Sequence, residues 1–76
     1  MLSVALPLPI ASGLLLVGHC YRTMEGDVLK VVAFDGSCVV YVVERNGIYP
    51  TWNKAAWRAM PKPGLAQQVE REVICK

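Results

Sequence analysis

The sequence predicts a mainly β fold, either a small barrel or a twisted antiparallel meander of four to five strands, with one short helix. Turn-forming residues recur at regular intervals, and the segments between them are rich in β-branched and aromatic residues. The 76 residues suffice for one domain only. With 54% apolar and 18% charged residues, the chain is too hydrophobic for a disordered protein. We therefore expect residues 1–76 to fold as a single domain.

The N-terminal segment, residues 1–19, contains no Asp, Glu, Lys or Arg. A run of this length is long enough for a membrane span or a signal peptide. However, the sequence has no Lys or Arg before Arg22, and Pro7 and Pro9 interrupt the run, so neither is favoured. We expect instead an extended, proline-containing apolar arm over residues 1–13 that lies on the core. The arm is also a candidate for docking to a partner or for assembly of a homo-oligomer.

Residues 14–51 are predicted to form the meander. Its three turn signals are Glu25-Gly26-Asp27, Asp35-Gly36-Ser37 and Asn46-Gly47. The last is the strongest, because Asn-Gly is the preferred pair for a two-residue type I′ hairpin. The strands bounded by these turns are 14–24, 28–34, 38–45 and 48–51.

Two of these strands contain nearly continuous apolar runs, at residues 31–34 and 38–43. Such runs indicate strands that are covered on both faces. In so short a chain the simplest cover is to curl the sheet, which also removes open strand edges. The sequence therefore favours an SH3-like barrel over a flat sheet.

The short helix is expected at residues 52–60, where three alanines favour it and Pro61 ends it. On a helix, Trp52, Ala56 and Met60 would form an apolar stripe that seals one end of the barrel. The tail, residues 65–76, is predicted to be a closing strand or a helix. It has apolar residues at helical spacing and an alternating pattern as well.

The clearest charge asymmetry lies between residues 45 and 64, where four basic residues occur and no acidic one. The candidate binding residues are Arg45, Lys54, Trp57, Arg58 and Lys62. Such a surface would contact phosphates or acidic side chains, and its tryptophan could stack on a base. The plainer alternative is an ordinary solvated helix face.

The sequence offers little for catalysis or metal binding. Its three cysteines are far apart and odd in number, which argues against a disulfide framework and favours small buried thiols in a reducing cytoplasm. The single histidine, His19, is next to Cys20, and adjacent residues on a strand point to opposite faces. Nucleotide-binding, zinc-protease and hydrolase motifs are absent from the sequence. We therefore expect no enzyme activity, no metal and no cofactor.

Residues 18–60 resemble small SH3-like proteins of bacteriophages and mobile elements. The resemblance rests on Gly18-His19-Cys20-Tyr21-Arg22, Val28-Leu29-Lys30-Val31-Val32, Val39-Val40-Tyr41, the Asn-Gly turn and Trp52. It implies an accessory protein that acts by binding, for example to a host defence or nucleic-acid-processing complex. The leading hypothesis is thus a protein-binding module, an inhibitor or adaptor, with Trp57 and Arg58 as the first candidate anchors. The alternatives are direct nucleic-acid binding and a self-associating structural protein.

Overall fold

The computed structural model describes residues 15–75, which fold into five antiparallel strands and two short helices. In chain order they are β1 (Cys20–Thr23), β2 (Val28–Asp35), β3 (Cys38–Val43), the 3-10 helix η2 (Lys54–Ala56), β4 (Arg58–Pro61), α1 (Lys62–Gln68) and β5 (Val69–Val73).

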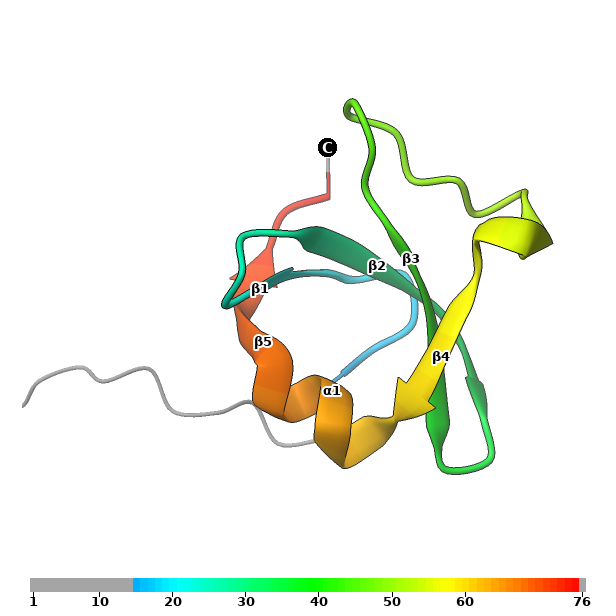
Figure 1. The fold of residues 1–76 in the computed structure, drawn as a ribbon, viewed down its shortest axis with the longest axis vertical. Coiled ribbons are helices and arrows are strands. Elements are labelled where there is room, and N and C mark those ends of the chain that lie inside the picture. Colours follow the sequence, from blue (N-terminus) through cyan, green and yellow to red (C-terminus); the bar gives the residue numbers. More distant parts are fainter. Residues whose placement is uncertain (1–14, 76) are drawn as a thin grey trace, which may run out of the picture.

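The five strands form one sheet in the order β4-β3-β2-β1-β5. The first four strands follow one another as a meander, and α1 then carries the chain across so that β5 pairs with β1 (Figure 1). The sheet curls into a half-barrel, with α1 below its opening in this view. The predicted mainly β fold, a curled antiparallel sheet with one short α-helix, is confirmed.

The hydrophobic core lies on one face of this sheet. Its buried members are Leu15, Tyr21, Leu29, Val31, Val39, Leu65, Ala66 and Val69. Strand residues two positions apart share a face, which is why Leu29 and Val31 point inward together. Helix α1 contributes Leu65 and Ala66, so the helix both connects the edge strands and covers the core.

Two further buried residues, Cys20 and Val42, lie outside this cluster on the other face of the sheet. They occupy one row across three strands, because Lys30 is paired with both. Val39 and Val42 are both fully buried although they lie on opposite faces of β3. Strand β3 is therefore covered on both faces, as predicted. The run at 31–34 in β2 is not covered throughout, since Phe34 is 41% exposed.

The Asn46-Gly47 turn forms as predicted. Both residues have positive φ, 54° and 79°, and Arg45 and Ile48 exchange two backbone hydrogen bonds of 2.8 and 2.9 Å. This is a two-residue hairpin turn of the type that Asn-Gly favours. The strand predicted at 48–51 is wrong, however, because pairing after the turn ends at the isolated Arg45–Ile48 bridge.

The helix predicted at residues 52–60 is also wrong. Only one 3-10 turn forms, capped by Asn53, whose side-chain oxygen accepts a 3.1 Å hydrogen bond from the Ala55 amide. The chain then becomes strand β4, in which Met60 pairs with Val39 and packs against the core. Pairing with the free edge of β3 has overridden the helix propensity of the alanines. No apolar stripe forms, since Trp52 is 72% exposed.

The α-helix begins where the predicted helix was expected to end. Pro63 lies in its first turn, where a missing amide hydrogen costs no hydrogen bond. The tail, for which strand and helix were both left open, contains both: the helix ends at Gln68 and β5 follows directly.

Candidate binding site

An open pocket of about 420 Å³ lies where β3 leaves the sheet and the segment leading to β4 returns. Its lining residues are Val43, Arg45, Ile48, Pro50, Asn53, Ala55, Ala56 and Arg58. We refer to it as the arginine pocket. Two local features build it: the Asn-Gly hairpin turns the chain back beside β3, and the 3-10 turn then directs it into β4.

Strand register explains why the two arginines share the pocket. Arg58 is the cross-strand partner of Tyr41, so their side chains lie on the same face of the sheet. Val43 and Arg45 are two and four residues after Tyr41. Because alternate residues of an extended chain share a face, all three side chains lie on that face. The extended pairing continues past the end of β3, because the Glu44 amide donates to the Val28 carbonyl at 2.8 Å.

The polar side chains that line the pocket offer hydrogen-bond donors. Arg45 and Arg58 are exposed, and neither has an ion pair or hydrogen bond to another side chain within residues 15–75. The side-chain oxygen of Asn53 is occupied by the Ala55 amide, which leaves the donor end of its amide group. No described residue of the lining is acidic. The site is therefore suited to an anionic group attached to apolar surface.

The other predicted binding residues do not line the pocket. Trp57 is half-buried, and its indole N–H donates a 3.0 Å hydrogen bond to the Thr51 carbonyl. This hydrogen bond holds the ring within the connecting segment, so only part of it is exposed. Lys54 lies beside it, with Nζ 5.7 Å from the centre of the indole ring. Lys62, at the start of α1, lies over the Phe34 ring at 4.5 Å.

Sequence reasoning missed two exposed residues near the pocket. Trp52 is 72% exposed in the same connecting segment, and Ile48 is 52% exposed in the pocket lining. Pro50 is the residue that could have indicated this exposed segment, because proline is typical of irregular connections. It argues against the strand predicted at 48–51 and the helix predicted at 52–60.

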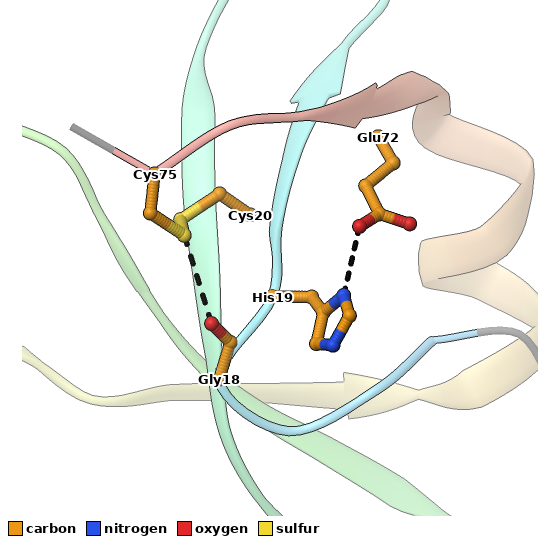
Figure 2. Close-up of a disulfide and its surroundings, with 5 residues drawn as sticks. All are labelled: Gly18, His19, Cys20, Glu72 and Cys75. Atoms are coloured by element: carbon orange, nitrogen blue, oxygen red, sulfur yellow. Dashed lines mark hydrogen bonds and ion pairs between the residues drawn. A yellow bond between two sulfur atoms is a disulfide. The ribbon is translucent and has the colours of Figure 1, made fainter.

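A second cluster surrounds a disulfide between Cys20 and Cys75, whose Cα atoms are 5.3 Å apart (Figure 2). The prediction that all three cysteines are unpaired is wrong, and only Cys38 is free. The cause is the β1–β5 pairing, which places Val73 opposite Cys20 and so brings Cys75 close. The predicted cytoplasmic location rested on unpaired cysteines and loses that support, because stable disulfides are typical of oxidising compartments.

His19 lies near this disulfide but is engaged elsewhere. Its Nδ1 is 2.7 Å from a carboxylate oxygen of Glu72, and Figure 2 shows the imidazole pointing toward that carboxylate rather than toward either sulfur. The Cys75 sulfur is 3.6 Å from the Gly18 carbonyl, and in the disulfide it has no proton to donate. The arrangement is that of a surface histidine–carboxylate hydrogen bond beside a structural crosslink.

Within residues 15–75, no group of three or more His, Cys, Asp or Glu side chains is arranged to hold a metal ion. No helix of this part of the chain is long and apolar enough to cross a membrane. The arm predicted at residues 1–13, with its alternatives of a signal or membrane segment and of a self-association element, lies outside the described residues.

No protein-family model matches the chain, and neither a curated protein nor a solved structure matches it, so the resemblance to small phage proteins stays a prediction.

Proposed function

We propose that this protein is a non-enzymatic protein-binding module and that the arginine pocket is its contact surface. The observation that carries the proposal is the pair Arg45 and Arg58, two exposed cations without partners in the described chain that line one partly apolar pocket. Arginine is enriched at protein interfaces, where it combines a planar donor group with an apolar stem.

The fold supports this use of the pocket. A paired sheet, crosslinked by a disulfide, holds β3 and β4, whereas the pocket wall comes from the irregular segment between them. Binding residues are commonly found on such connections above a rigid scaffold. With the resemblance to phage proteins, the partner we propose is a host protein or complex, which the module inhibits or to which it acts as an adaptor.

One observation favours nucleic acid as a second candidate. Lys54 precedes the pocket-lining residues of η2, and Trp52 in the same segment is exposed enough to stack on a base. If this candidate is correct, affinity for single-stranded DNA should fall steeply with added salt, because each neutralised phosphate releases counterions.

The proposal can be tested by placing a photo-crosslinking amino acid at Ile48, which is exposed and lines the pocket, in the oxidised full-length chain. A matched probe at Met24, exposed at 63% but outside the pocket lining, controls for random contact. We expect a discrete adduct with a host protein from the Ile48 probe only. The adduct should be lost with Arg58→Ala and kept with Arg71→Ala, an exposed arginine of β5 outside this pocket. Equal adducts from both probes, or adducts unaffected by Arg58→Ala, would contradict the proposal.

A further inference from the structure

We infer, resting on the proposed function, that the arginine pocket recognises an extended acidic segment of the partner in which two carboxylates flank an apolar side chain at alternate positions. The occupant is thus a peptide segment of the form acidic–x–apolar–x–acidic. Its two carboxylates would meet Arg45 and Arg58, and its central side chain would lie on the apolar wall.

The first support is the distribution of unpaired cations. The three lysines among residues 15–75 each lie over an aromatic ring, with Nζ 4.5–5.9 Å from the ring centre, and Arg22 is 3.6 Å from the Glu70 carboxylate. Within the same residues, Arg45, Arg58 and Arg71 have no such partner. Only the first two line the same pocket, and no acidic side chain of its described lining competes for them.

The second support is spacing. Arg58 stands opposite Tyr41, and Arg45 lies four residues after Tyr41, two residues past the end of β3, with Val43 between them in the chain. Four residues of extended chain span roughly 13 Å. In an extended peptide, side chains i and i+4 lie on one face at this same distance of roughly 13 Å, and side chain i+2 lies midway between them. The two outer carboxylates and the central apolar group therefore match the two arginines and Val43.

The third support is the chemistry of the wall between the arginines. Ile48, Pro50, Ala55 and Ala56 are apolar and present no charge. Asn53 adds an amide donor at their side, because its oxygen is already used by η2. A carboxylate accepts from guanidinium and amide donors together, whereas a cationic or purely apolar segment would leave these donors desolvated and unpaired.

The test uses the oxidised full-length protein, labelled with ¹⁵N, and three capped peptides of matched length. They are acetyl-Glu-Ser-Leu-Ser-Glu-amide, its Gln counterpart acetyl-Gln-Ser-Leu-Ser-Gln-amide, and the rearranged acetyl-Ser-Glu-Leu-Glu-Ser-amide. The last has the same composition and charge as the first, but places both carboxylates on the face opposite the leucine. Amide shifts of Ile48 and Ala55 report occupancy of the pocket, including weak binding.

We expect the first peptide to bind roughly 2- to 30-fold more tightly than the Gln peptide, as two solvent-exposed ion pairs would give. It should also bind more tightly than the rearranged peptide. Arg45→Ala and Arg58→Ala should each remove part of the preference, and Arg71→Ala should leave it unchanged. Arg58→Glu should reverse it, so that a fourth peptide of the same length, acetyl-Lys-Ser-Leu-Ser-Glu-amide, binds more tightly than the first.

Equal binding of the first and rearranged peptides would overturn the inferred geometry, because only the net charge would then matter. Failure of all peptides to shift these amides would overturn the ligand class. So would tighter, Arg58-dependent binding of a twelve-nucleotide oligothymidylate. The proposed function can survive any of these results, since it depends on Arg58-dependent crosslinking to a host protein and not on peptide chemistry.

Discussion

Breaking the Cys20–Cys75 disulfide should lower the free energy of unfolding by about 4 kcal/mol at 25 °C if the bond acts by restricting the unfolded chain. The two cysteines are 55 residues apart, and the entropy of closing a loop of that length gives this value in the chain-entropy treatment. Proteins of 76 residues have unfolding free energies of roughly 4–11 kcal/mol. The loss is therefore a large share of the whole stability and leaves the reduced protein with an unfolding free energy of roughly 0–7 kcal/mol.

Urea unfolding followed by circular dichroism, with and without a phosphine reductant, measures this loss directly. The Cys38→Ser variant serves as the background, because it removes the free thiol and with it intermolecular exchange. Alkylation and mass spectrometry establish that both remaining thiols are reduced. A fully reduced protein that loses less than about 1 kcal/mol would refute the view that the crosslink acts chiefly through the unfolded chain.

Three further changes probe the fold. Gly47→Ala should cost about 1–2 kcal/mol in urea unfolding, because φ is +79° and the added Cβ meets no atom within 4 Å, so the cost is that of the backbone alone. Gly64→Ala, at an ordinary φ in α1, is the control and should cost little or nothing. Val42→Ala should cost on the order of 2 kcal/mol, since the side chain is fully buried on the second face of the sheet; an effect as small as that of exposed Val17→Ala would show that this face is not packed. Burial raises the pKa of the Tyr21 hydroxyl, so the folded state holds this proton more tightly than the unfolded state. Stability from this group is complete below pH 10 and should fall as the pH rises above it, and Tyr21→Phe should remove that part of the alkaline slope in urea midpoints.

Local chemistry accounts for what the sequence predicted well. The Asn46-Gly47 turn depends on two residues that adopt positive φ at low cost, and no distant contact is needed to specify it. Strands β2 and β3, which precede this turn, are likewise indicated by their β-branched residues. Arg45 and Arg58, two of the predicted binding residues, line one pocket, although the reason for their proximity, pairing of β3 with β4, was not foreseen.

Long-range pairing accounts for what the sequence could not predict. The alanines between residues 54 and 60 favour a helix. Only a 3-10 turn forms at Lys54–Ala56, because Arg58–Pro61 pairs with the edge of β3 and Met60 packs on the core. The disulfide follows from the pairing of β5 with β1. The odd number of cysteines argued against any disulfide, although two of the three are paired. Trp57 stays a predicted anchor on the basis of its residue type, and its indole hydrogen bond to a backbone carbonyl of the same segment was not foreseen. None of these contacts has a signature in neighbouring residues.

The disulfide also makes residues 20–75 a covalently closed ring. A protease that cuts this ring once, for instance after Lys54 in the connecting segment, opens it without producing two molecules. The cut would fall between Arg45 and Arg58 in the sequence, yet both arginines would remain on one molecule, held together by the sheet and by the crosslink. The pocket wall can therefore be cleaved once while the two arginines stay on one molecule.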